Sequence, residues 1–159
     1  MYNMLIDRLS SAGYEQYEIS NFAQPGFQSK HNSSYWHDIP YIGIGASAHS
    51  YDIKSRHWNV SDITKYISGI ESCTLPFEEE IIDKNTKYDD LITTAMRTHE
   101  GIDTEKLKID FGNDLYTYFM NEADKHINNG TLKNLNGRIS LTRKGLFVSD
   151  DIMSDLMHV

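Results

Sequence analysis

Apolar residues in the first stretch of the chain change from a helical to a strand-like spacing. Met4 and Leu9 belong to one face of a predicted helix over residues 2–12, and Gly13 follows as a favourable helix end. Residues 14–22 then carry aromatic and aliphatic side chains in a pattern that predicts a strand. A helix followed by a strand is one step of an α/β fold.

The middle of the chain is richer in glycine, proline and polar residues. We expect a long loop, a glycine-rich strand, a second short strand, a helix capped by Ser61 and a linker. These elements would cover residues 23–40, 41–51, 56–60, 62–71 and 72–80, respectively. Long loops in compact proteins are commonly functional, so the first of these segments is a candidate site.

The second half returns to helical spacing, with helices predicted over residues 81–99, 104–110 and 114–129. Asp103 is placed to cap the second of these helices. Asn136-Gly137 then stands between two strand-like runs and predicts a hairpin, because both turn positions need a positive φ. Thr142 is placed to cap a last helix over residues 143–156. Three helices, a hairpin and a helix predict a winged-helix-like module.

Charge and cysteine content narrow the classes of function. The net charge of −8 argues against general affinity for nucleic acid or anionic membranes. The presumed recognition helix over residues 114–129 offers Lys125 against three acidic residues, which is the wrong sign for phosphate contact. No stretch approaches the ~18 apolar residues that span a bilayer. Cys73 has no second cysteine for an internal disulfide, which indicates a reduced, cytoplasmic compartment.

The densest chemical constellation is His31-Asn32-Ser33-Ser34-Tyr35-Trp36, followed by His49 in the glycine-rich stretch. An imidazole beside Tyr35 and Trp36 offers an axial nitrogen and flat apolar walls to a haem. The same residues also suit a loop whose histidines make ordinary structural hydrogen bonds. Composition alone leaves both interpretations open.

Two further features carry candidate chemistry. Gly43 and Gly45 could bring backbone amides close to a nucleotide or sulfonium cofactor, or could form a tight strand bend. The stretch lacks the third glycine and the helix of a dinucleotide-binding fingerprint. Glu18, at the predicted strand's end, is a candidate catalytic carboxylate and equally a structural edge charge.

Several motifs of the first half resemble those of a known family. They are G-Y-E-Q-Y-E-I-S-N-F-A over residues 13–23, Pro25-Gly26, His31-Asn32-x-x-Tyr35-Trp36 and Gly43-x-Gly45-Ala46-x-Ala48-His49-Ser50. In combination they resemble the radical-SAM proteins grouped with oxygen-independent coproporphyrinogen III oxidase, and most of all the HemW branch of haem chaperones. Gly101-Ile102-Asp103 and Ile139-Ser140-Leu141-Thr142-x-x-Gly145 are similar to that family's C-terminal domain.

The resemblance implies an α+β fold with two parts. Residues 1–78 would be the last β/α elements of an incomplete TIM-like barrel, and residues 79–159 a winged-helix-like C-terminal domain of the HemN type. In this family, three thiolates of an N-terminal C-x-x-x-C-x-x-C motif hold a [4Fe–4S] cluster, and S-adenosylmethionine binds its open iron. One cysteine cannot supply these ligands, so we expect both cofactors in a longer parent protein and not in this chain.

The resemblance also implies roles for single residues. Gly43, Gly45, Ala46 and Ala48 would lie near the S-adenosylmethionine pocket of the whole barrel. The chaperone branch implies haem contact, with His31, Tyr35, Trp36 and His49 as the haem-binding candidates, His31 first among them. A longer parent would be a radical-SAM oxidoreductase, whereas we do not expect this chain alone to be an enzyme.

Three functional hypotheses follow. The first is the C-terminal portion of a haem chaperone that delivers haem to a client protein. The second is the C-terminal portion of a coproporphyrinogen III oxidase of porphyrin biosynthesis, whose substrate carboxylates would call for arginines that are scarce in the first half. The third is a winged-helix module that docks a partner. We further expect self-association through an open strand edge.

Overall fold

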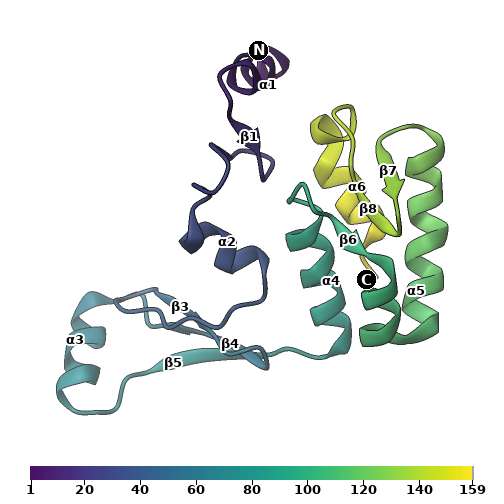
Figure 1. Cartoon of the computed structure of the whole chain (residues 1–159). Helices are drawn as coiled ribbons and strands as arrows, with labels where there is room; N and C mark the ends of the chain where they lie inside the picture. The colour runs from purple at the N-terminus through teal and green to yellow at the C-terminus, as the bar shows by residue number, and fades with distance from the viewer. Residues whose placement is uncertain (159) are drawn as a thin grey trace. The chain divides into compact units, whose positions relative to one another are not determined.

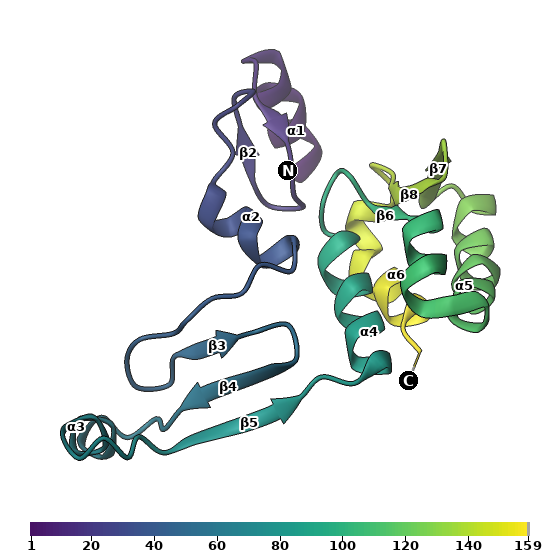
Figure 2. The ribbon, with the colours of Figure 1, turned by 60° about the horizontal axis from the view of Figure 1, so that its bottom comes forward.

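The computed structural model describes residues 1–158, which form two compact units. One unit combines an N-terminal segment, residues 1–37, with a C-terminal domain, residues 84–158. The other, here called the sheet unit, comprises residues 38–83. Both units contain helices and strands, which confirms the predicted mixture of the two (Figures 1 and 2).

The elements follow one another along the chain with short connections. The N-terminal segment holds α1 (Tyr2–Ser11), β1 (Glu15–Gln16), β2 (Phe22–Ala23) and α2 (Lys30–Trp36). The sheet unit holds β3 (His49–Tyr51), β4 (Ser55–Asn59), α3 (Ile63–Glu71) and β5 (Phe77–Ile81). The C-terminal domain holds α4 (Lys84–Ala95), β6 (Ile102–Asp103), α5 (Thr104–Asn128), β7 (Leu132–Leu135), β8 (Arg138–Leu141), a 3-10 turn (Gly145–Val148) and α6 (Ser149–Leu156).

The hydrophobic core lies in the C-terminal domain, among α4, α5, α6 and an antiparallel sheet of order β6-β8-β7 (Figure 1). Its most completely buried side chains are Tyr88, Ile92, Met96, Ile102, Leu107, Phe119, Ala123, Ile139, Ile152 and Leu156. The Tyr88 hydroxyl donates to the carbonyl oxygen of Leu156 at 2.9 Å, so its polar end is satisfied inside the core. Burial raises the pKa of Tyr88.

Capping and turn residues of the C-terminal domain act as predicted. The Asp103 carboxylate accepts the backbone N–H of Lys106 at 3.1 Å and begins α5. Asn136 and Gly137 have φ values of 55° and 80° and form the tight turn between β7 and β8, which confirms the predicted hairpin. The two helices predicted over residues 104–129 are joined into α5, which is interrupted by the extended, positive-φ backbone of Gly112.

The last predicted helix is correct in place and wrong in form. Thr142 Oγ1 accepts the backbone N–H of Gly145 at 3.2 Å, as expected of a cap. A 3-10 turn follows, and α6 begins at Ser149. The predicted span over residues 143–156 is therefore two consecutive elements.

In the N-terminal segment, α1 ends before Gly13 as predicted, but the single strand predicted over residues 14–22 is wrong. The chain forms two short strands, with Glu15 opposite Ala23, and turns back between them. Tyr17 N donates to the carbonyl oxygen of Asn21 at 3.1 Å across this turn. The residues on the two sides of this turn have the apolar and polar order expected of one continuous strand, so the sequence pattern predicts a single strand there.

The long loop predicted over residues 23–40 contains a helix, α2. Ser29 Oγ accepts the backbone N–H of Asn32 at 3.2 Å and caps it. The helix has seven residues, which is too short for a recognisable apolar period. The histidine motif therefore sits on a helix instead of in a loop.

The N-terminal segment is joined to the C-terminal domain by backbone hydrogen bonds and by arginine side chains, among them Arg143. Ile19 N donates to Arg97 O at 3.0 Å, and His99 N donates to Tyr17 O at 3.2 Å. Farther along the chain, Arg143 donates three hydrogen bonds to α1, at Asn3 Oδ1 (2.7 Å), Asn3 O (2.8 Å) and Asp7 Oδ1 (2.6 Å). This guanidinium lowers the pKa of Asp7, and α1 buries none of its own residues.

The sheet unit is a three-stranded antiparallel sheet of order β3-β4-β5 with one helix. Strand β4 agrees with prediction within one residue. Residues 41–51 are mostly irregular and become a strand at β3, and the predicted linker over residues 72–80 contains most of β5. Asp62, not Ser61, caps α3, because its Oδ1 accepts the backbone N–H of Lys65 at 3.0 Å.

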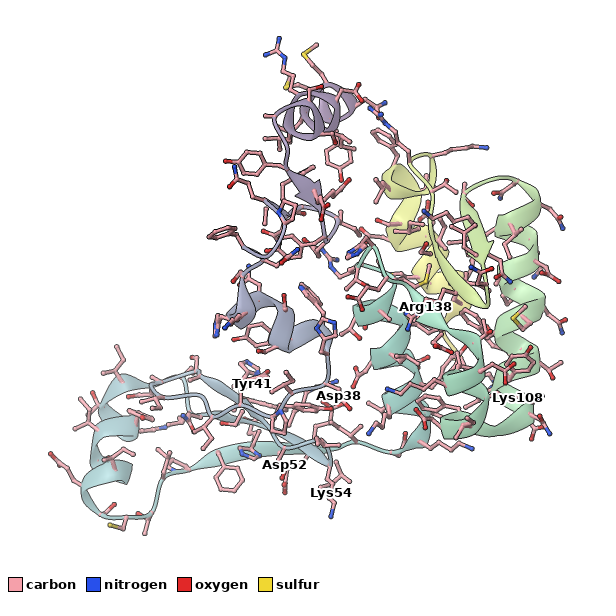
Figure 3. The ribbon with its side chains drawn as sticks, viewed as in Figure 1. Asp38, Tyr41, Asp52, Lys54, Lys108 and Arg138 are labelled. Carbon is pink, nitrogen blue, oxygen red and sulfur yellow. The ribbon has the colours of Figure 1, made fainter. Side chains whose placement is uncertain are left out.

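Polar contacts fix the turn between β3 and β4, where Asp52 and Lys54 lie close together (Figure 3). Asp52 Oδ1 accepts the backbone N–H groups of Ser55 at 2.7 Å and Lys54 at 3.0 Å. These bonds lower the pKa of Asp52. At the other edge of the sheet, every residue of β5 is exposed, including the run Glu78-Glu79-Glu80.

Among the described residues, no helix combines the length and apolar character that crossing a membrane requires.

Candidate functional site

Helix α2 carries three of the predicted haem-binding side chains, His31, Tyr35 and Trp36. His31 and Tyr35 are four residues apart and share one helix face, where their rings meet edge to face with centroids 5.2 Å apart. The Tyr35 hydroxyl lies 3.4 Å from His31 Nε2, which is long for a hydrogen bond. Both side chains are exposed. An iron ion could therefore replace this weak contact at the imidazole nitrogen.

Trp36 lies against the end of α4, under an arginine. The Cζ atom of Arg97 is 5.4 Å from the centroid of the Trp36 ring, a cation–π distance. Trp36 Nε1 is buried and has no hydrogen-bond partner among the described residues. Because an unpaired buried N–H loses its hydration without compensation, this atom is a candidate donor to a ligand or a bound water.

The opposite side of Arg97 contacts the buried carboxylate of Glu18, which is 2% exposed. Arg97 Nε donates to Glu18 Oε1 at 3.3 Å. Glu18 Oε2 accepts the backbone N–H of Ser20 at 2.9 Å and Nδ2 of Asn21 at 2.7 Å. The E-x-S-N motif thus folds on itself, and its carboxylate anchors Arg97. Catalysis by Glu18 stays a prediction.

A shallow pocket of about 390 Å³ lies beside Trp36. Its lining comes from α2, α4, α6 and the residues that follow the two latter helices: Trp36, Thr93, Thr94, Arg97, Asp150, Met153, Ser154 and Met157. An indole and two polarizable thioethers line it together with the guanidinium of Arg97 and the carboxylate of Asp150, a lining that suits a flat, mainly apolar ligand.

The glycine-rich residues form an irregular loop in the sheet unit. A Cβ at Gly43 would lie 2.1 Å from the carbonyl oxygen of His49, so a close backbone approach requires glycine there. Gly43 N donates to Ser50 Oγ and Gly45 N to the Tyr66 hydroxyl, each at 3.0 Å. Both amides thus have partners within the unit. At Gly45, a Cβ would meet open space.

Asn59 holds this loop from the end of β4. Its Nδ2 donates to Gly45 O at 2.9 Å, and its backbone N–H donates to Ala48 O at 3.0 Å. The bonds from Asn59 of β4, and the one from Gly45 N to Tyr66 of α3, therefore fix Gly45, whose φ is 118°, and the loop that contains Ala46. A role for Gly43, Gly45, Ala46 and Ala48 in cofactor binding stays a prediction.

The fourth haem-binding candidate, His49, lies in the sheet unit, at the first residue of β3. Its exposed ring stacks on Trp58 of β4, with centroids 5.7 Å apart. Trp58 in turn donates from Nε1 to Glu78 Oε2 at 3.2 Å. The structure thus gathers His31, Tyr35 and Trp36 on one helix and places His49 in the other unit.

The donor set does not fit an iron–sulfur cluster. A [4Fe–4S] cluster of this class needs three thiolates, and Cys73 is the one cysteine of the sequence. Within residues 1–158, no group of three histidine, cysteine or acidic side chains is arranged to hold a metal ion.

Sequence reasoning missed Arg97 and Asn59. Arg97 lies 79 positions from Glu18, at the end of a helix that belongs to another part of the chain. No local pattern links those residues. Asn59 lies inside a predicted strand, and the sequence offers only its polar side-chain amide as a signal; the structure shows that this side chain is buried.

Comparison with known proteins first defines the class. Residues 82–148 match the family model described as the HemN C-terminal domain. The structure resembles that of coproporphyrinogen III oxidase (HemN) from Escherichia coli, described as a radical SAM enzyme, with a TM-score of 0.72 over 97% of this chain and 39% of that one. At 14% sequence identity, this likeness shows the shared fold.

The sequence relatives are more specific. The chain is 30% identical over 157 residues to the heme chaperone HemW of Lactococcus lactis, covering 99% of this chain and 41% of that protein. It is 28% identical over 153 residues to HemW of Bacillus subtilis, covering 96% and 40%. The chain therefore carries a HemN-type C-terminal domain over residues 82–148 and is similar to HemW proteins over nearly its whole length. It spans about two fifths of the length of these curated relatives.

Proposed function

We propose that this chain is the C-terminal portion of a radical-SAM haem chaperone, which binds haem on α2 and passes it to a client protein. The observation that carries the proposal is similarity to HemW proteins over nearly the whole chain, together with an exposed His31 on a capped helix. The acceptor protein and the cytoplasmic location are parts of the same proposal.

His31 is the proposed axial ligand. Its exposed imidazole makes a long contact with Tyr35, and iron–nitrogen bonding is stronger than such a contact. Tyr35 and Trp36 would supply aromatic surface beside the ring. The pocket lined by Trp36 and Arg97 adds an apolar surface and a guanidinium that a propionate would share with Glu18. Haem contact by His49, which belongs to the sheet unit, is a separate proposal.

For the whole protein, we propose the division implied by the family resemblance. Residues 1–78 would complete a partial barrel, and residues 79–159 would be a winged-helix-like domain. The order helix, strand, kinked helix, hairpin and helix in the C-terminal domain supports the second part. The S-adenosylmethionine and cluster sites would belong to the longer parent, with residues 43–48 near the S-adenosylmethionine.

The second candidate is the C-terminal portion of a coproporphyrinogen III oxidase. The fold shared with E. coli HemN favours it. A winged-helix docking module is the third, because the C-terminal domain contains its own hydrophobic core. Self-association of the chain is a further proposal, since α1 and α3 expose apolar side chains.

Haem titration tests the first proposal. The wild type should give a Soret shift with saturable binding, and His31→Ala should weaken binding at least about tenfold because an axial ligand is lost. His158→Ala is the matched control, since His158 is also exposed and lies near the C-terminus. Equal affinity of wild type and His31→Ala would remove His31 from the site. Titration with coproporphyrinogen would favour the second candidate if it bound and haem did not.

A further inference from the structure

A second cavity lies on the other side of Arg97, where the turn of the N-terminal segment meets the C-terminal domain. Its volume is about 210 Å³. Its lining comprises Ile6, Gln16, Glu18, Ile19, Met96, Arg97, Thr98, His99, Lys133, Leu141, Thr142, Arg143 and Leu146. No residue of the histidine motif lines it.

Cationic groups are concentrated around this cavity. Arg97, Lys133 and Arg143 line it against the single carboxylate of Glu18, in a chain whose net charge is −8. The Glu18 carboxylate already accepts hydrogen bonds from Ser20, Asn21 and Arg97. A cluster of positive charge in an acidic protein creates a local attraction for anions.

The three cations are not equally available. Arg97 is paired with Glu18, and Arg143 with Asp7. The ammonium group of Lys133 has no hydrogen bond or ion pair with any described residue and is exposed at its strand. Lys133 is therefore the cation that a ligand would meet first.

His99 adds a polar group of defined orientation. Its Nδ1 lies 3.2 Å from the carbonyl oxygen of Tyr17. Because a carbonyl oxygen accepts and never donates, Nδ1 carries the hydrogen, and Nε2 is left as the second contact point.

The remaining lining is apolar. Met96 is completely buried, and Ile6, Ile19, Leu141 and Leu146 complete the apolar wall. The volume lies below the range of ~300–1,000 Å³ typical of drug-sized ligands, so a single short chain fits and a ring system does not.

From this combination we infer that the cavity binds a carboxylate on a short apolar chain. The carboxylate contacts Lys133, with the neighbouring arginines adding to the positive field, and the aliphatic part packs between Met96 and Leu146. Such a group exists as a free carboxylic acid and as the carboxylate arm of a larger molecule. The site is separate from the proposed haem contact at His31.

Isothermal titration of the full chain with hexanoate tests the inference. Hexanoate should bind with a dissociation constant on the order of 1 mM, as expected for a ligand of this size. Acetate lacks the apolar chain and hexanamide lacks the charge, so each should bind at least about fivefold more weakly. No saturation with hexanoate by about 20 mM would overturn the inference.

Two variants locate the binding. Lys133→Gln should weaken hexanoate binding about tenfold, since it removes the unpaired cation of an exposed strand position. Lys106→Gln is the control: Lys106 is an exposed lysine of α5 and does not line the cavity. Leu146→Gln should weaken binding through loss of apolar contact. Equal affinity of the wild type and Lys133→Gln, with unchanged circular dichroism, would contradict the site.

Competition separates the two sources of the carboxylate. Haemin that displaces hexanoate from both the wild type and His31→Ala would show that a propionate arm occupies the cavity. Hexanoate binding unaffected by haemin would assign the cavity to a free small carboxylate. Both results support the site, and the hexanoate titration does not depend on whether His31 binds haem.

Discussion

Arg97 Nε lies 3.3 Å from Oε1 of Glu18, across 79 positions of sequence, and this pair joins the N-terminal segment to the C-terminal domain. The carboxylate is 2% exposed, while the arginine side chain is 34% exposed. The same guanidinium covers the Trp36 ring. The side chain of Arg97 therefore contacts both the Glu18 motif and the histidine motif and holds them against the C-terminal domain.

Arg97→Ala should lower the free energy of unfolding by about 1–3 kcal/mol, because it leaves a buried carboxylate with one partner fewer. Partial exposure of the arginine keeps the effect below that of a fully buried pair. Urea unfolding measures it. Arg138→Ala is the matched control, since Arg138 pairs with Asp103 at the surface and should change stability by less than about 0.5 kcal/mol. Equal losses in the two variants would contradict a special role for the Glu18 pair.

Tyr88 gives a pH dependence with a defined sign. Burial raises its pKa in the folded state, so the phenol stays protonated there when it ionises in the unfolded chain. The contribution of Tyr88 to the free energy of unfolding is fully present below pH ~10, the ordinary tyrosine pKa, and is lost as the pH rises above that value.

The comparison is between wild type and Tyr88→Phe. The variant should be about 1 kcal/mol less stable at pH 8, because the hydrogen bond to Leu156 is lost. The difference in unfolding free energy between the two proteins should narrow at pH ~11, because Tyr88 ionises in the unfolded wild type and the variant has no phenol at this position. Thermal unfolding at both values measures the gap. A gap of constant size would show that Tyr88 ionises equally in both states.

Gly145, within the segment that matches the HemN C-terminal domain, permits a close backbone approach. A Cβ at this position would lie 2.1 Å from the carbonyl oxygen of Thr131. Gly145→Ala should cost more than about 2 kcal/mol because the backbone must shift. Gly13→Ala, the control, meets no atom within 4 Å and should cost about 1 kcal/mol for its positive φ. A reversed order in chemical denaturation would argue against the clash.

Arg143 holds α1 through its bonds to Asn3 and Asp7. Arg143→Ala should raise hydrogen exchange of the α1 amides about fivefold or more, since the helix buries none of its own residues. Arg8→Ala on the same helix should leave exchange near that of the wild type. Unchanged exchange in Arg143→Ala would show that other contacts hold α1.

Local chemistry explains which parts of the fold were predictable. Asn136-Gly137, Asp103 and Thr142 act through neighbours within three residues, so sequence alone located the hairpin and two caps. The kink at Gly112 was also visible as a gap between two predicted helices. The N-terminal turn was not, because the local hydrogen bonds that Glu18 accepts from Ser20 and Asn21 are combined with a contact to Arg97 in a distant part of the chain.

The candidate site divides in the same way. The histidine motif is contiguous, so the sequence alone identifies its residues. Its helical form was not predicted, because a seven-residue helix is set by Ser29 and by contacts with α4. Lys133 and Arg143 had no local signal, since cavity lining depends on which segments the fold brings together.

Strand β5 also bears on how copies of this protein meet. It is the edge of its sheet, and two copies aligned antiparallel about Glu79 would place Glu78 of each opposite Glu80 of the other. Because side chains alternate between the two faces of a strand, Glu78 and Glu80 of both copies would meet on one face and the two Glu79 side chains on the other. Repulsion between these carboxylates disfavours edge-to-edge pairing near neutral pH. Protonation of the carboxylates in acid would weaken that repulsion.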